Sequence, residues 1–99
     1  MYPAEVVHHC IGRCLLRYNI KIEYIDYQTL NDMIRYKIDC KLIETNLGDN
    51  IYEIEYELYP DIIYFYVGWD KKQKHISTFL PPRKLYLQRI KEQILKKRR

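Results

Sequence analysis

The sequence predicts an α+β fold, with an N-terminal helix, a mainly antiparallel sheet of about five strands and a basic C-terminal helix in a single domain, 1–99. Three observations predict it: helical spacing of apolar residues near the start, strict alternation in two central segments, and a proline pair before a second helical pattern. The chain is 47% hydrophobic and 30% charged, a composition that excludes a disordered protein.

The first segment, 3–18, is predicted to form a helix. Pro3 suits a first helical turn, and Glu5 suits the positive end of the helix dipole. Apolar residues recur at spacings of three and four and form one stripe: Val7, Ile11, Cys14, Leu15 and Tyr18. We expect the helix to stop at Asn19, and we expect Gly12 to mark a close contact with another element.

A long β-hairpin is predicted from the two alternating segments, 34–45 and 51–59, which are joined by turn residues at 46–50. A register in which paired residue numbers sum to 94 sets Lys41 opposite Glu53 and Lys37 opposite Glu57. Such opposite-charge pairs contribute about 0.2–1 kcal/mol each, so we expect this register. The alternating acids of the second strand, Glu53, Glu55 and Glu57, are interpreted as a solvated sheet face.

The remaining elements are shorter. Segment 20–25 is predicted to be a strand, and the polar segment 26–32 a loop or one helical turn. Segment 62–69 is apolar on both faces, which indicates a central strand or a subunit interface, and 75–80 is the fifth strand. Two prolines, at 81 and 82, end that strand and open the last helix, whose apolar stripe is Leu87, Ile90 and Ile94.

Charge is unevenly distributed along the chain. Segment 83–99 carries eight basic side chains and one acidic one, a net +7, whereas 1–82 carries nine basic and twelve acidic side chains, a net −3. Such asymmetry is typical of contact with a polyanion or a membrane surface, and also of a solvated helix face with a basic tail. If the last helix folds back along the fifth strand, its end lies near a second basic cluster, and the candidate nucleic-acid-binding residues are Lys71, Lys72, Lys74, Arg89, Lys91, Lys96, Lys97, Arg98 and Arg99.

Trp69 lies next to this basic turn, where it could stack on a base, although a tryptophan in a strand is more often a core residue. Cys10 and Cys14 are one helical turn apart and could chelate a metal, but we expect no metal site, because His8 and His9 point away from each other and no Cys-x-x-Cys motif exists. We expect the three cysteines to be reduced and mostly buried, and we expect no cofactor.

No catalytic motif is evident. Asp61 and the run from Asp70 to Lys72 imitate the acidic pair of a metal-dependent nuclease, but these acids bracket one strand and would lie about 30 Å apart. No glycine-rich phosphate loop is present, and nothing indicates a small-molecule substrate. The sequence therefore predicts a protein that is not an enzyme.

The abundance of Ile and Tyr exceeds what a small core needs, which predicts a homodimer. No apolar stretch is long enough to span a membrane and the start lacks the pattern of a signal peptide, so we expect an intracellular protein.

Ile, Tyr, Lys and Asn fill 39 of the 99 positions, with segments such as IYEIEYELY and IIYFYVGW. In this composition the chain resembles the small uncharacterised proteins of crenarchaeal filamentous viruses, the lipothrixviruses and rudiviruses. The resemblance implies a viral origin, and with it a place in the host cytoplasm, and it assigns no functional residue. Abundant Lys, Glu and Ile with few Gln and Met is typical of thermophilic proteins.

Two functions remain open. The first is a small non-enzymatic protein that associates with DNA or RNA, with weak sequence preference, through the basic C-terminal helix. The alternative is a dimeric structural or protein-interaction module that binds no nucleic acid. Binding to nucleic acid that weakens with salt would separate the two.

Overall fold

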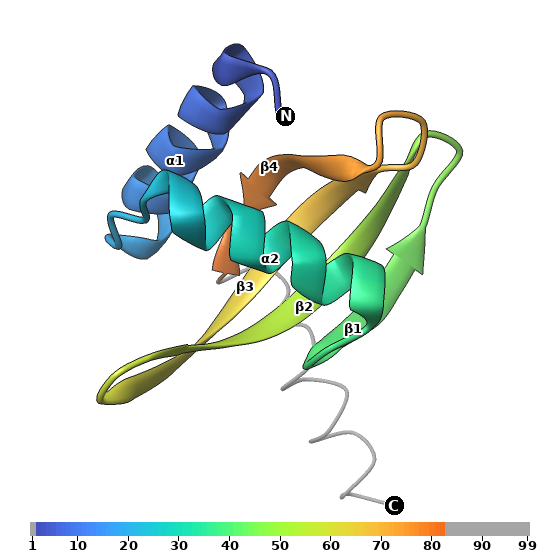
Figure 1. Ribbon diagram of the computed structural model, residues 1–99. Helices are drawn as coiled ribbons and strands as arrows, with labels where there is room; N and C mark the ends of the chain where they lie inside the picture. The colour runs from blue at the N-terminus through green and yellow to red at the C-terminus, as the bar shows by residue number, and fades with distance from the viewer. Residues whose placement is uncertain (1, 83–99) are drawn as a thin grey trace, which may run out of the picture.

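The computed structural model describes residues 2–82, which form an α+β arrangement of two helices followed by an antiparallel sheet (Figure 1). The sheet has the order β1-β2-β3-β4, so each strand pairs with its neighbour in the sequence. The predicted C-terminal helix lies outside the described residues. The elements are α1 (Ala4–Tyr18), α2 (Tyr24–Tyr36), β1 (Cys40–Thr45), β2 (Asp49–Leu58), β3 (Asp61–Asp70) and β4 (His75–Leu80).

Helix α1 confirms the first predicted element. Its first turn is closed by the amide of Val7, which donates to the carbonyl oxygen of Pro3 at 3.1 Å. Asn19 ends the helix in the left-handed conformation, with φ of 56°, and donates its amide to the carbonyl of Leu15. The expected close contact at Gly12 is wrong, because a Cβ built there meets nothing within 4 Å.

Helix α2 covers the last two residues of the predicted strand 20–25, all of segment 26–32 and the first residues of the predicted hairpin. The predicted strand is wrong, because 20–23 form neither helix nor strand, and 26–32 forms part of a long helix rather than a loop or one helical turn. The buried side chains Tyr27, Leu30 and Ile34 recur at helical spacing and face the core. Asn31 shares this buried face. Because Asn31 is polar, it interrupts the apolar stripe, and the pattern of hydrophobic residues does not reveal the helix. The sheet therefore has four strands rather than about five.

The central hairpin is confirmed, but it starts later than predicted. The chain leaves α2 through Lys37, in the left-handed conformation with φ of 57°, and β1 begins only at Cys40. The predicted register holds where Lys41 pairs with Glu53, but Lys37 lies outside the strand and does not pair with Glu57. After Leu42 the register shifts, so that Glu44 pairs with Ile51.

Strand β3 is central, as its apolar faces predict, because β2 and β4 pair with it on either side. Both helices lie on the same face of the sheet, with α1 next to β4 (Figure 1). Hydrogen bonds tie α1 to that strand: Arg17 Nη1 donates to the carbonyl oxygen of Phe79 at 2.6 Å, and Tyr18 Oη donates to that of Leu80 at 2.7 Å. Neither α1 nor α2, the helices of residues 2–82, is long and apolar enough to cross a membrane.

The core lies between the helices and the sheet. The residues from the helices and from the connection between them are Val7, Cys10, Cys14, Ile22, Tyr27, Leu30 and Ile34. They pack against side chains of three strands: Ile54, Phe65, Val67, Trp69, Ile76 and Phe79. Because successive side chains of a strand alternate, the other face of the sheet carries a different set of residues. This second face is called the helix-free face below.

Candidate functional site

The predicted basic turn joins β3 to β4 and carries Lys71, Lys72 and Lys74. Lys71 fastens the neighbouring β1–β2 turn: its Nζ donates to the carbonyl oxygen of Asn46, and its amide donates to that of Gly48 at 3.2 Å. Lys72 and Lys74 are exposed. The turn therefore offers two exposed cations, and the other predicted binding residues, from Arg89 onwards, lie outside the described range.

Trp69 belongs to the core rather than to a base-stacking surface. It is 8% exposed, and the guanidinium of Arg35 lies 5.7 Å from the centre of its ring. The same guanidinium lies 5.3 Å from the ring of Tyr2, and the neighbouring His75 is also buried, with its ring edge-on to Tyr2. Arg35 therefore occupies the space beside this indole, which confirms the core interpretation.

The helix-free face carries a ladder of tyrosines and glutamates. Across β2 and β3, Glu53 pairs with Tyr66 and Glu55 pairs with Tyr64. Tyr66 Oη donates to Glu53 Oε2 at 2.7 Å, and Tyr64 Oη donates to Glu55 Oε1 at 2.9 Å. The second bond raises the pKa of Tyr64, because the carboxylate stabilises the protonated hydroxyl.

The predicted solvated row of acids is correct for only two of its members. Glu55 and Glu57 are exposed, but Glu53 is 8% exposed and Tyr66 is 1% exposed. A buried carboxylate needs hydrogen bonds or an opposite charge, and Tyr66 supplies one such bond. The helix-free face therefore carries both exposed acids and a buried pair, whereas an ordinary solvated face would expose all of these side chains.

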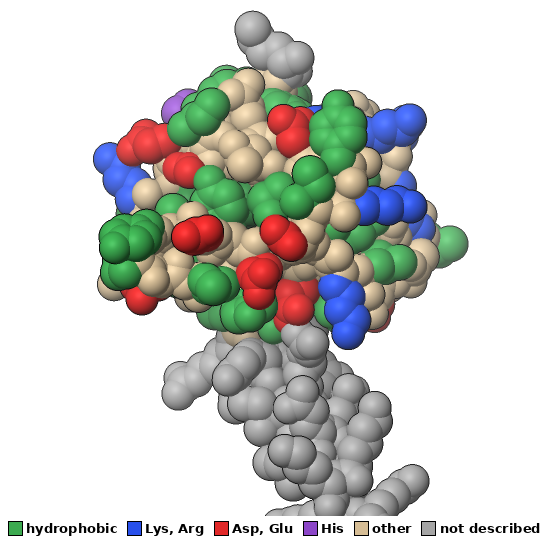
Figure 2. All heavy atoms as spheres, turned by 60° about the horizontal axis from the view of Figure 1, so that its bottom comes forward, with side chains coloured by type: hydrophobic (Ala, Val, Ile, Leu, Met, Phe, Trp, Pro, Cys, Tyr) green, Lys and Arg blue, Asp and Glu red, His purple; other side chains and the backbone are tan. Residues whose placement is uncertain are grey.

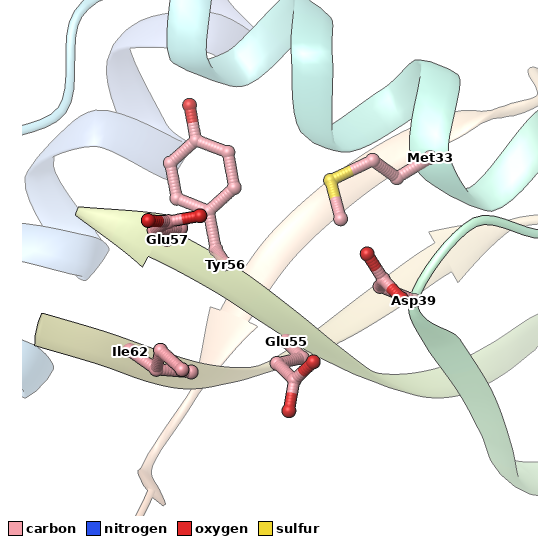
Figure 3. A pocket seen from close by; sticks show the side chains of 6 residues that line it. All are labelled: Met33, Asp39, Glu55, Tyr56, Glu57 and Ile62. Carbon is pink, nitrogen blue, oxygen red and sulfur yellow. The ribbon is translucent and has the colours of Figure 1, made fainter. Parts of the chain in front are cut away.

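A hollow of about 260 Å³ opens where β2 runs past the start of β1 (Figure 3). Tyr56 rises from β2 towards α2, where its Oη donates to Asp26 Oδ1 at 2.7 Å, and burial raises its pKa to about 12. Glu55 points to the opposite side of the strand. The lining is half acidic and half apolar or aromatic: Asp39, Glu55, Glu57, Met33, Tyr56 and Ile62.

A second hollow of about 220 Å³ adjoins the first and shares Asp39 and Glu55 with it. Its other lining residues are Cys40, Lys41, Glu53 and Tyr64. The two hollows together are called the acidic groove. Four carboxylates and one lysine line it, and acidic and hydrophobic side chains are interspersed on the surface seen in Figure 2. Such a lining suits a cationic segment that also carries apolar side chains.

The other groups considered for catalysis or metal binding are the cysteines and the acids at the two ends of β3. Cys10 and Cys14 are buried free thiols, and burial raises the pKa of each to about 12, while Cys40 is half-buried and free. No cluster of three or more potential metal ligands occurs within residues 2–82. Asp61 and Asp70 are the two ends of β3, so the nuclease-like arrangement does not form.

No protein-family model matches the chain, and no match is found among curated proteins or solved structures. Sequence reasoning missed the acidic groove, although Glu-x-Glu-x-Glu in 53–57 and Tyr-x-Tyr in 64–66 are the signal for it. That signal becomes readable only when the pairing of the two strands is known.

Proposed function

We propose that this is a small non-enzymatic protein that associates with nucleic acid, with weak sequence preference, through segment 83–99. The observation that carries the proposal is charge segregation, since this segment has a net +7 and the rest of the chain a net −3. Cations that neutralise phosphates release counterions, which gives affinity for DNA or RNA without reading bases. Acting on nucleic acid would place the protein inside a cell, in the host cytoplasm if its origin is viral.

Two features of the described residues support this assignment. The exposed lysines of the β3–β4 turn, Lys72 and Lys74, can extend a phosphate-binding surface. The buried thiols of Cys10 and Cys14 have a raised pKa and stay protonated near neutral pH, which makes these two residues poor nucleophiles.

The test is deletion of the last four residues, Lys96 to Arg99. Affinity for DNA and RNA should fall for all sequences, and the slope of log affinity against log salt should decrease by up to about 3.6 if all four cations contact duplex phosphates. The matched control is Lys21→Gln, an exposed cation between the helices, which should leave the slope unchanged. An intact chain that shows no affinity at low salt would contradict the proposal.

A second candidate is a homodimeric protein-interaction module. Large apolar side chains are exposed on several elements, among them Leu16 at 72%, Ile25 at 64% and Ile62 at 57%. A second copy could cover such residues. Sedimentation at micromolar concentration tests this candidate, which predicts a species of twice the 12.2 kDa chain mass and no binding of nucleic acid.

A further inference from the structure

We propose that the acidic groove is the docking site of segment 83–99 of the same chain. Strand β4 delivers this segment to the edge of the helix-free face, and the groove carries the opposite charge. The docking involves the same segment to which the proposed function assigns nucleic-acid binding, but it is tested without nucleic acid.

The path of the chain supports segment 83–99 as the part that docks in the acidic groove. Leu80, the last residue of β4, pairs with Tyr66 of β3. Because the two strands are antiparallel, β4 runs towards the end of β3 at which Ile62 lines the groove. That residue is four positions from Tyr66, about 13 Å along the strand. A segment of 17 residues spans about 25 Å even as a helix, so it can reach the groove from Pro82.

The chemistry of the segment matches the lining of the groove. The groove holds four carboxylates and one lysine, and segment 83–99 holds eight cations and one acid. Apolar residues occur on both sides. On the helix-free face Ile62 and Tyr64 line the groove, whereas Met33 and Tyr56 line it from the side of α2. In the segment, Leu87, Ile90 and Ile94 recur at helical spacing. A basic amphipathic segment in an acidic and apolar groove is a common mode of recognition.

The burial of Tyr66 and Glu53 distinguishes one part of the helix-free face. Both side chains lie on the helix-free face and are 1% and 8% exposed, and Tyr18 of α1 accepts a hydrogen bond from the backbone amide of Tyr66 at 2.9 Å. Tyr64, two positions along the same face of β3, is 45% exposed. The buried pair lies beside Leu80, where the chain leaves the sheet.

The docking has a consequence for the cations of the segment. Carboxylates of the groove and phosphates of a nucleic acid attract the same lysines and arginines. The groove would therefore compete with nucleic acid for these cations, and a polyanion would need to displace segment 83–99 from the groove. This consequence applies only if the proposed function is correct, whereas the docking itself does not depend on it.

Zero-length carbodiimide coupling between carboxylates and lysine amines tests the contact in the full chain. The coupling is done on an equal mixture of ¹⁴N- and ¹⁵N-labelled protein. Coupled peptides should join Asp39, Glu55 or Glu57 to lysines of segment 83–99, and each should carry a single isotope. Peptides that mix the two isotopes would show that a second copy is the occupant, and coupling that avoids the groove would also overturn the proposal.

Limited cleavage by trypsin tests the charge argument. Glu57→Lys should speed cleavage within 83–99 about fivefold at low salt, because it replaces an attraction with a repulsion. The matched control is Glu44→Lys, the same exchange at an exposed residue of β1 outside the groove. Equal cleavage rates in the two variants, with equal stability to denaturant, would overturn the proposal.

Discussion

Tyr66 Oη lies 2.7 Å from Glu53 Oε2 across β2 and β3, and both side chains are buried. Two residues along the same face, Tyr64 and Glu55 form the same pair at 2.9 Å, but both are exposed. The sheet therefore contains two copies of one hydrogen bond in different surroundings. Their comparison tests how the contribution of such a bond to stability changes between a buried and an exposed site.

Tyr66→Phe should lower the free energy of unfolding by about 1–3 kcal/mol, because it leaves a buried carboxylate with one hydrogen bond fewer. Tyr64→Phe is the matched control and should change it by less than about 0.5 kcal/mol, since water replaces the lost partner of an exposed group. Urea denaturation of both variants measures the difference. Equal losses would show that burial does not distinguish the two pairs.

Asn31→Ala should lower the free energy of unfolding by about 2–3 kcal/mol. The buried Asn31 Oδ1 accepts the amide hydrogen of Ile76 at 2.8 Å and so joins α2 to the start of β4. Its Nδ2 donates to the carbonyl oxygen of Tyr27 at 2.7 Å. Thr29→Ala, an exposed change on the same helix, is the control and should be near neutral. Denaturation midpoints compare the two variants, and a neutral Asn31→Ala would contradict this account.

Gly12→Ala should raise the free energy of unfolding by about 1 kcal/mol. The residue lies inside α1 and is exposed, and an added Cβ meets nothing within 4 Å. Alanine restricts the unfolded chain more than glycine does, and it costs nothing sterically at this position. Thermal unfolding should show a higher midpoint, and a lower midpoint would indicate a contact at this position.

Stability should fall as pH rises from about 9 to about 12. The thiols of Cys10 and Cys14 ionise near 9.0 when unfolded, but burial raises the pKa of each to about 12 in the folded protein. Above pH 9 the unfolded chain therefore binds fewer protons than the folded one, and the equilibrium shifts towards unfolding. Denaturation at several pH values measures the slope. Cys14→Ala should make it shallower, and an unchanged slope would contradict this assignment.

The strands predicted at 51–59, 62–69 and 75–80 form because their side chains alternate or are apolar on both faces. Helix α2 could not be predicted, since its buried stripe includes the polar Asn31 and its end runs into residues that alternate by coincidence up to Ile38. In this stretch the helical and strand periods fit the same apolar positions, and tertiary packing decides between them.

The candidate site was predictable only in part. The exposure of Lys72 and Lys74 follows from their place in a charged turn. The engagement of Lys71 does not, because it depends on how closely the β1–β2 turn approaches. The acidic groove depends on Asp39, which follows α2, and on the pairing of β2 with β3, and neither is encoded in a local pattern.

Because α1 packs against β4, the core can be completed only late in the synthesis of the chain. The helix is made first, but its hydrogen-bond partners in Phe79 and Leu80 are made about sixty residues later. Until that strand leaves the ribosome, the stripe that contains Cys10 and Cys14 has no sheet edge to cover it. Completion of the core is therefore a late, cooperative event that joins the two ends of the described chain, rather than stepwise growth from the N-terminus.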